Sequence, residues 1–201
     1  MKQNVIIRRY QKVDLEDVKN ICIATASERA RREEKHRQFT LYMYCLPYLE
    51  RERALVAEVD GVVVGYVLYT LDYALFIKHM QPYMSKIEAI SQEYSLRMRH
   101  EHDLYARFQN DYPAHLHIDC LPGYTGLGIG SQLIETMADD LKDEVNGVML
   151  GVSKTNQGAI NFYKKHDFDI LDEDNAGYVM GRQLKKTTEC GLDGCNDAIH
   201  K

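Results

Sequence analysis

The chain has 201 residues, of which 45% are hydrophobic and 27% charged, and its formal net charge is −5 with a pI near 5.9. This length fits one domain with a sizeable core, and the acidic balance argues against a nucleic-acid binder, which usually carries a basic face. No apolar run approaches the length of a membrane span, residues 1–10 are too polar for a signal peptide, and five scattered cysteines favour reduced thiols in the cytoplasm.

The first fifty residues predict a strand followed by helices. Residues 4–9 have the composition of a short strand, and Asp14 stands where it would cap the amphipathic helix that follows. A run of both charge signs at 27–38 indicates a solvated helix face or loop, with the polar rim of a substrate site as the alternative. The apolar, tyrosine-rich stretch at 39–49 predicts a helix broken near Pro47 that packs on the core or lines a pocket.

A hairpin and a helical segment come next. Residues 54–71 hold two β-rich runs around the Asp-Gly pair at 60–61, the dipeptide favoured at a tight hairpin turn. The segment 72–113 is polar and helical in character. Its His100 and His102 lie two apart on a predicted helix and point in different directions, so we do not expect them to share a metal.

A strand, a glycine-rich turn and a helix follow one another from His115 to Leu133. Polar and apolar residues alternate along the strand, so that His115, His117 and Asp119 share one face. The turn has glycines at alternate positions: Gly126, Gly128 and Gly130. Glycines let the backbone approach a ligand closely, and a helix start offers an anion unpaired N–H groups and a favourable dipole. The order of these elements therefore indicates a phosphate site.

The residues around the glycines exclude two common phosphate sites. A P-loop needs Lys and then Ser or Thr after its last glycine, and a dinucleotide turn needs the spacing G-x-G-x-x-G. The turn instead resembles the pyrophosphate-binding turn of the GNAT superfamily of acetyl-CoA-dependent N-acetyltransferases, in which Gln or Arg precedes two residues, Gly, one residue, and Gly or Ala. Gly128 and Gly130 fill the small positions, whereas Thr125 departs from the family at the Gln or Arg position. The resemblance implies coenzyme contacts from Thr125, Gly126, Leu127, Gly128, Ile129, Gly130 and Ser131.

A second motif follows a predicted strand at 147–153. The segment 154–168 resembles the family pattern N-x-x-A-x-x-F-Y-x-x-x-G-F, with Asp167 where glycine is common. The resemblance implies that Asn156 contacts the pantetheine arm of the coenzyme or its neighbourhood, and that Tyr163 lies near the thioester sulfur. Taken alone, Asn156 could be only a helix cap and Tyr163 only a half-buried aromatic residue. The matching residues, of which the first three are assigned to the coenzyme, are Asn156, Ala159, Phe162, Tyr163 and Phe168.

The resemblance covers residues 4–71 and 114–184 and implies the α/β GNAT fold. This fold has a mixed, mostly antiparallel central sheet of about six to seven strands flanked by helices. We expect a single acetyltransferase domain over 1–184, in which 72–113 is a helical insertion before the central strand that shapes the acceptor side. Residues 185–201 are expected to form a C-terminal tail.

Acetyl transfer to an amine needs a base for the ammonium, a donor for the developing oxyanion and a proton for the leaving thiolate. We expect Tyr163 to be the general acid and a backbone N–H within 118–120 to be the oxyanion donor, freed by splaying of this strand from its neighbour as in the family. For the base we favour Asp119 acting through water, then His117, because Gly151 stands where some family members carry Glu. Structural hydrogen bonding or a metal site is the alternative for this pair. The strand residues expected at the coenzyme are Ile118, Asp119 and Cys120.

The resemblance does not identify the acceptor. The acidic chain favours a cationic amine, either a small molecule or a peptide terminus, and exposed strand edges would allow a homodimer. We expect no metal, since Cys190, Cys195 and His200 lack a fourth zinc ligand. The acidic charge and the lack of a long apolar run likewise predict no nucleic-acid or membrane partner. A non-catalytic acetyl-CoA sensor or scaffold is the alternative function, because Thr125 and Gly151 replace family residues.

Overall fold

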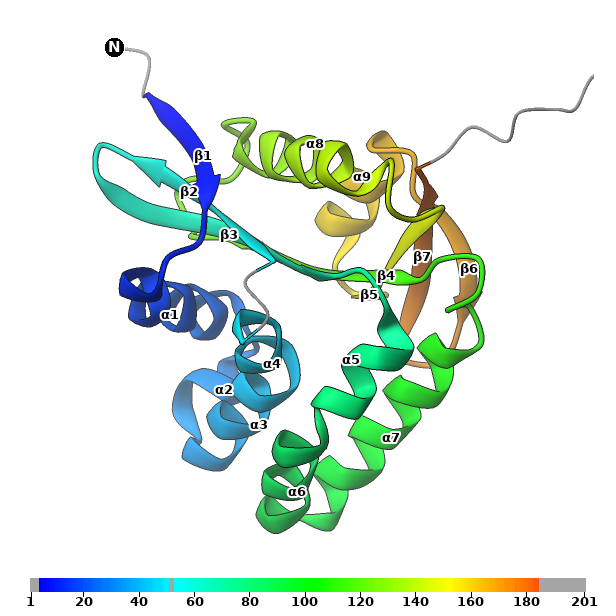
Figure 1. Ribbon diagram of the computed structural model, residues 1–201. Helices are drawn as coiled ribbons and strands as arrows, with labels where there is room; N and C mark the ends of the chain where they lie inside the picture. The colour runs from blue at the N-terminus through cyan, green and yellow to red at the C-terminus, as the bar shows by residue number, and fades with distance from the viewer. Residues whose placement is uncertain (1–3, 51–52, 185–201) are drawn as a thin grey trace, which may run out of the picture.

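One mixed sheet of seven strands divides the molecule into two layers of helices (Figure 1). The computed structural model describes residues 4–50 and 53–184, so the tail predicted at 185–201 lies outside the described residues. The strand order is β1-β2-β3-β4-β5-β7-β6, and all neighbours are antiparallel except β4 and β5. This architecture confirms the predicted sheet. The strands are β1 (Val5–Arg9), β2 (Ala54–Val59), β3 (Val62–Thr70), β4 (Ala114–Cys120), β5 (Gly147–Ser153), β6 (Asp169–Glu173) and β7 (Gly177–Gln183).

The two faces of the sheet carry different sets of helices (Figure 1). One face is covered by α8 (Ile129–Leu141) and α9 (Gln157–Lys165). The other is covered by the amino-terminal helices and the insertion. These are, after the short 3-10 helix η1 (Lys12–Asp14), α1 (Leu15–Thr25), α2 (Glu28–Arg32), α3 (Glu34–Tyr44), α4 (Leu46–Leu49), α5 (Tyr73–His79), α6 (Gln81–Ile90) and α7 (Gln92–Ala106). None of the described helices is long and apolar enough to cross a membrane.

Each face of the sheet has its own hydrophobic core, because successive strand residues point to opposite sides. The core under α8 and α9 includes Leu55, Val67, Leu116, Leu133 and Met137. The core under α1 to α7 includes Val18, Phe39, Tyr66, Leu68 and Met98. Each layer of helices is therefore packed on the sheet through a separate hydrophobic core.

The β2–β3 hairpin forms where the Asp-Gly pair predicted it. Asp60 and Gly61 have φ angles of 51° and 83°. Two consecutive positive φ values give a type I′ turn, whose twist matches that of the flanking strands. This turn confirms the predicted hairpin, in which β2 and β3 pair antiparallel.

The helix predicted over 39–49 is broken near Pro47, as expected, into α3 and α4. The break lies at Cys45, whose φ of −128° and ψ of −72° are not helical. Pro47 lies just after the break, in the first turn of α4. Proline is tolerated there because its missing N–H would have no partner within the helix. The position of the break agrees with the prediction.

Two further amino-terminal features were predicted, and one of them differs in the structure. Asp14 directly precedes α1 but makes no side-chain cap. Its carboxylate instead binds the Arg8 guanidinium, at 2.7 and 2.9 Å, and accepts the Gln11 N–H at 2.8 Å. The charged run at 27–38 forms α2 and the start of α3 and is mostly exposed, with local ion pairs such as Arg29–Glu33, as predicted for a solvated helix face; only Ala30 and His36 are buried.

Strands β4 and β5 separate after a short contact. They pair in parallel only at Ala114 with Val148 and at His115 with Met149. Beyond that point β4 stays paired with β3 as far as Cys120, and β5 stays paired with β7. The divergence opens a gap in the ladder, which we call the split, and confirms the splaying expected from the resemblance.

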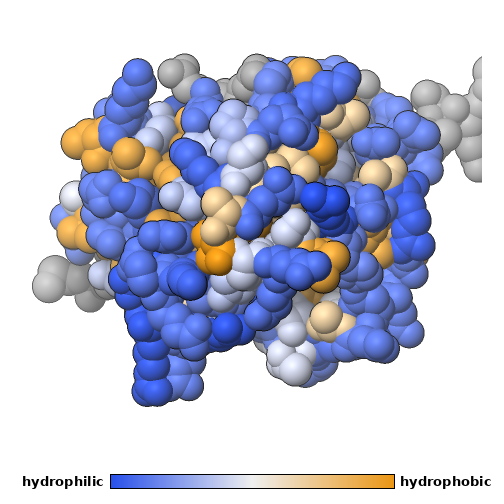
Figure 2. Space-filling model, turned by 90° about the horizontal axis from the view of Figure 1, so that it is seen from below, coloured by the Kyte–Doolittle hydropathy of each residue, from blue (hydrophilic) through white to orange (hydrophobic). Residues whose placement is uncertain are grey.

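The insertion at 72–113 consists of α5, α6 and α7. Seen from the side of these helices, the molecule is mostly hydrophilic, with hydrophobic residues scattered among polar ones (Figure 2). Most large apolar residues of this segment are buried, including Phe76, Met80 and Tyr105, whereas Leu75 and Leu96 are exposed. The insertion therefore turns its apolar side inward, toward the sheet.

Candidate active site

The turn after β4 holds a left-handed backbone. Leu121 N–H donates to the Val64 carbonyl at 2.8 Å, which ties the start of the turn to β3. Gly123, Gly126 and Gly128 then have φ angles of 94°, 79° and 80°. An L side chain is strained at these angles, so the glycines are needed for the path of the chain. Gly128 is also the N-cap of α8.

The amides in the second half of this turn, from 125 to 131, have no acceptor among the described residues. The first amide of α8 to be paired is that of Gln132, which donates to the Gly128 carbonyl at 3.1 Å. Unpaired amides at a helix start, together with the positive end of the helix dipole, form an anion site. The turn thus fits the pyrophosphate of coenzyme A.

Gly130 has a different role from the other glycines of the turn. A Cβ at this position would lie 3.2 and 3.3 Å from two ring atoms of Phe162. Gly130 therefore lets α8 approach α9 closely. Next to it, Ser131 Oγ lies 2.9 Å from Nε2 of His166, whose Nδ1 lies 3.0 Å from Glu135. This packing joins the two motifs that the sequence analysis had linked to one coenzyme.

The split presents alternate backbone amides of β4. Because Leu121 N–H points to β3, the period of two along a strand turns the N–H groups of 117 and 119 the same way. The N–H groups of Ile118 and Cys120 then face the split. Asp119, which was expected among the coenzyme contacts, has its N–H on the β3 side. Its side chain, and not its backbone amide, is the group available for chemistry.

Tyr163 lies on α9, on the coenzyme side of the sheet. It is buried, and burial together with the nearby Asp119 and Cys120 raises its pKa above the usual value for tyrosine. The phenol is therefore protonated at neutral pH, as a general acid must be. Asn156 is exposed and caps α9, since its side chain accepts the Ala159 N–H at 3.1 Å. This cap agrees with the alternative interpretation of Asn156 given from the sequence, in which the residue only caps a helix.

Asp119 and His117 lie together on the opposite face. The Tyr66 hydroxyl donates to Oδ2 of Asp119 at 2.6 Å, and Nε2 of His117 lies 3.4 Å from the same oxygen. Burial raises the pKa of Asp119. Burial would lower the pKa of His117, but the Asp119 carboxylate and the Cys22 thiol outweigh it, and the pKa is raised. The pair can therefore hold a proton near neutral pH.

A cavity of about 320 Å³ opens beside the split, on the side of His117. This is the size of a small-molecule pocket. His117 lines it but Asp119 does not. Its floor is made by both edges of the split, namely Leu116, His117, Gly151 and Val152. Its walls come from α3, α4, α5, α7 and the β6–β7 turn, and include Tyr48, Tyr73, Phe76, Met80 and Tyr105.

The Tyr105 side chain reaches from α7 to the floor of this cavity. A Cβ on Gly151 would lie only 1.9 Å from the Tyr105 hydroxyl oxygen. The phenol thus occupies the space in which a side chain at position 151 would begin. Burial raises the pKa of Tyr105 well above the usual value, so the hydroxyl keeps its proton. It has no hydrogen-bond partner among the side chains that the structure describes.

Two neutral histidines border the cavity. His115 shares the face of His117 and Asp119, as predicted, but its Nδ1 contacts the Tyr48 hydroxyl at 2.7 Å. Burial lowers the pKa of His115 to about 3 and that of His102 to about 4. Both nitrogens of His102 and Nε2 of His115 are buried without a partner among the described residues. Neither ring carries a charge at neutral pH.

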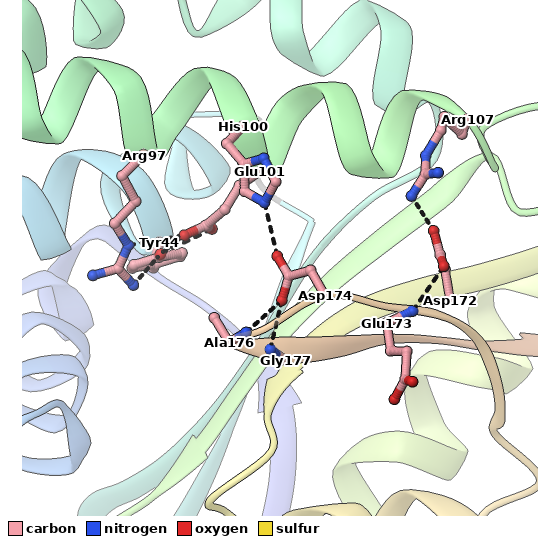
Figure 3. A network of polar contacts seen from close by, with 10 residues as sticks. All are labelled: Tyr44, Arg97, His100, Glu101, Arg107, Asp172, Glu173, Asp174, Ala176 and Gly177. Carbon is pink, nitrogen blue, oxygen red and sulfur yellow. Dashed lines mark hydrogen bonds and ion pairs between the residues drawn. The ribbon is translucent and has the colours of Figure 1, made fainter.

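The charged groups at the cavity mouth are already paired (Figure 3). Glu101 accepts hydrogen bonds from the Tyr44 hydroxyl at 2.7 Å and from Arg97 Nε at 3.0 Å. Asp174, in the β6–β7 turn, accepts from His100 at 2.7 Å. Arg107, at the end of α7, also binds Asp172 of β6. The contacts of Asp174 and Asp172 hold α7 against the carboxy-terminal hairpin, and that of Tyr44 holds it against α3.

The predicted residues gather around the split from two faces. The phosphate turn, Phe162 and Tyr163 lie on the α8–α9 side, and His117 and Asp119 lie on the cavity side. Residues that the sequence analysis missed include Tyr66, Glu101 and Tyr105. For α7 a signal was present, because its buried residues recur at helical spacing: Tyr94, Met98, His102 and Tyr105. Within the described residues no group of three or more His, Cys, Asp or Glu side chains could hold a metal ion.

Comparisons with known proteins agree with this geometry. Residues 23–168 match the Acetyltransferase (GNAT) family. The protein "Probable N-acetyltransferase san" of Drosophila melanogaster is 32% identical over 81 residues, which span 35% of this chain and 44% of the fly protein. The crystal structure of SsHAT superposes with a TM-score of 0.79 at 26% identity, over 91% of this chain and 100% of that one. The paiA N-acetyltransferase of Thermoplasma acidophilum, solved with coenzyme A, shares the fold with a TM-score of 0.55 at 15% identity, over 90% of this chain and 99% of its own. The chain therefore belongs to the GNAT family of acetyltransferases.

Proposed function

We propose that the protein transfers the acetyl group of acetyl-CoA to a primary amine by direct attack within a ternary complex. The observation that carries this proposal is the split, which has an unpaired phosphate turn at one end and groups for acid and base chemistry on its two faces. Amine and thioester can meet in the split from opposite sides of the sheet. The reaction then needs no covalent enzyme intermediate.

The coenzyme would bind on the α8–α9 side. The amides of 125–131 would hold the pyrophosphate. The helix dipole of α8 would compensate for the Gln or Arg side chain of the family pattern, which Thr125 replaces here. The N–H groups of Ile118 and Cys120 would bind the pantetheine amide and the thioester carbonyl. Ala159 and Phe162 would lie beside the pantetheine arm, with Asn156 near its entry.

The acetyl group is transferred in two steps: the amine attacks the thioester, and the resulting tetrahedral intermediate then loses the thiolate. The amine nitrogen bonds to the thioester carbon, and a β4 amide donates to the oxygen as negative charge develops on it. A preorganised donor of this kind contributes on the order of 3 kcal/mol. The carbon–sulfur bond then breaks, Tyr163 donates its proton to the departing thiolate, and the proton that the nitrogen loses as it becomes an amide replaces the one on the phenol, through solvent.

His117 is the better placed base. Its ring lines the cavity, whereas the Asp119 carboxylate points to Tyr66 and to His117 itself. We propose that His117 removes the ammonium proton, directly or through one water, and that Asp119 stabilises the imidazolium. This order reverses the one favoured from the sequence, in which Asp119 came first.

Calorimetric titration with acetyl-CoA and with free coenzyme A tests the coenzyme site, and release of the coenzyme A thiol in the presence of amines tests the transfer. One-to-one binding followed by amine-dependent thiol release supports the proposal. Binding without release from any amine class favours the scaffold alternative. The absence of binding would contradict both.

The free thiols of Cys22, Cys45 and Cys120 are consistent with the proposed cytoplasmic location.

A further inference from the structure

A molecule bound in the cavity beside the split would contact both β4 and β5 at the proposed reaction centre. Its floor contains His117 from one strand and Gly151 from the other. A molecule bound there meets the thioester from the face opposite to the coenzyme. The chemistry of this cavity therefore bears on which amine the protein accepts.

The inner walls of the cavity are aromatic and apolar. Tyr48, Tyr73 and Phe76 pack their rings against one another, with centroids 4.4 to 6.1 Å apart, and Met80 lies beside them. These side chains are at most 5% exposed. An apolar body of ring size removes its own surface from water when it fills such a space.

The carboxylates at the cavity are not free to bind a second cation. Glu101 is held by Tyr44 and Arg97, and Asp174 accepts from His100 and from the backbone amides of the following turn. An acceptor with several ammonium groups would need a free counter-charge for each group beyond the reacting one. The neutral rings of His102 and His115 provide none.

The Tyr105 hydroxyl marks the place for the amine nitrogen. It lies over Gly151 at the floor of the cavity, and no described side chain occupies its lone pairs. Because the phenol is protonated, its oxygen can accept an N–H of the incoming amine without taking the proton. Such a contact orients the nitrogen lone pair toward the split.

We propose that the acceptor is a small monoamine whose apolar, ring-sized body fills this cavity and whose nitrogen is bound by the Tyr105 hydroxyl. The paired carboxylates thereby disfavour polyamines, and the apolar walls disfavour a peptide, whose backbone amides would be left there without hydrogen-bond partners. This inference rests on the acetyl transfer proposed above, and it departs from the general preference for cationic amines that the acidic composition suggested.

The first test compares three probes at saturating acetyl-CoA: 2-phenylethylamine, spermidine and tetra-alanine with a free amino terminus. Thiol release should have a kcat/KM for 2-phenylethylamine at least about tenfold above that of the other two. A preference for spermidine or tetra-alanine overturns the inference. So does the failure of all three amines in a protein that binds acetyl-CoA in the calorimeter. A protein that does not bind acetyl-CoA contradicts the proposed function itself.

The second test is Tyr105→Phe with 2-phenylethylamine as the probe. Loss of one neutral hydrogen bond should lower kcat/KM about fivefold to tenfold, mainly through KM, and leave acetyl-CoA binding unchanged. Tyr94→Phe is the matched control, because it removes a phenol from the same helix, where it contacts Nδ1 of His36 at 3.0 Å away from the cavity. Equal effects of the two variants, or none from Tyr105→Phe, would contradict the assignment.

Discussion

Nε2 of His100 lies 2.7 Å from Oδ2 of Asp174, and this contact joins α7 of the insertion to the turn between β6 and β7. The other oxygen of Asp174 accepts the N–H groups of Ala176 and Gly177, at 2.7 and 2.8 Å. His100 and these backbone donors lower the pKa of Asp174 to about 2. One carboxylate thus shapes the carboxy-terminal turn and anchors the helix that covers the cavity (Figure 3).

Asp174→Asn should weaken the fold more at pH 7 than at pH 3, because part of the carboxylate's effect is lost between these two values. The native pKa lies below the ordinary value of 3.8, so the carboxylate stabilises the fold above that value and loses its effect as pH falls toward about 2. Because the group is partly exposed, we expect a loss of about 1 kcal/mol at pH 7. Urea unfolding at pH 7 and pH 3 measures it. Asp139→Asn, which removes only an exposed pair with Lys142, is the control, and an equal loss from Asp174→Asn at both pH values would contradict the prediction.

Gly128→Glu should abolish acetyl-CoA binding. The substitution forces a side chain into a backbone with φ of 80° and brings a negative charge to the proposed pyrophosphate site. Gly61→Glu is the matched control, because Gly61 has φ of 83° and equally open surroundings in a distant hairpin. Both variants should lose about 1 to 2 kcal/mol of stability, but only Gly128→Glu should lose binding in the calorimeter. Binding that survives in Gly128→Glu would show that the turn does not hold phosphate.

Local signals explain what could be predicted from sequence. The hairpin at Asp60 and Gly61 needs only turn chemistry, and the strand, turn and helix around Gly128 need only alternation, left-handed positions and helical spacing. The two coenzyme motifs were recognised because each lies within a short stretch of chain. The split also followed, although from the resemblance and not from the residues themselves.

The cavity could not be predicted because its walls come from segments far apart in the chain. Tyr48, Tyr105 and Gly151 meet only when α4, α7 and β5 are packed on one sheet. Periodicity could indicate that Tyr105 is buried, but not that its hydroxyl stands over Gly151. Our proposal of His117 before Asp119 as the base has the same origin, since Tyr66 on the neighbouring strand donates to one oxygen of the Asp119 carboxylate.

Tyr163→Phe should lower turnover and spare the coenzyme. The phenol is the proposed proton donor to the thiolate, which leaves readily, so we expect a decrease in kcat of about tenfold to a hundredfold. The ring that packs under α8 is kept, and the dissociation constant of acetyl-CoA should not change. Steady-state thiol release and calorimetry measure the two quantities, with Tyr42→Phe as a control outside the cavity. An unchanged kcat would remove Tyr163 as the acid.

His117 should set the acidic limb of the pH–rate profile. Its pKa is raised above 6.5 by Asp119 and Cys22, so kcat/KM should fall as pH drops through a value above 6.5, where the ring becomes protonated and ceases to act as a base. His117→Gln should remove this limb and lower kcat/KM by about 10²-fold or more. His79→Gln, a change outside the cavity, should leave the profile intact. A limb that persists in His117→Gln would assign the base to another group.

Gly151→Ala should be destabilising in a way that depends on Tyr105. The new Cβ would lie 1.9 Å from the Tyr105 hydroxyl oxygen but 3.0 Å from the nearest ring carbon. Overpacking of this kind costs about 1 to 3 kcal/mol, and removal of the oxygen in Tyr105→Phe should relieve most of it. Urea unfolding of the two single variants and the double variant gives the coupling energy, which we expect to exceed about 0.5 kcal/mol. Gly158→Ala, whose Cβ would be 3.8 Å from its nearest neighbour, should cost nothing. Additive effects of Gly151→Ala and Tyr105→Phe would mean that the phenol does not stand over Gly151 in solution.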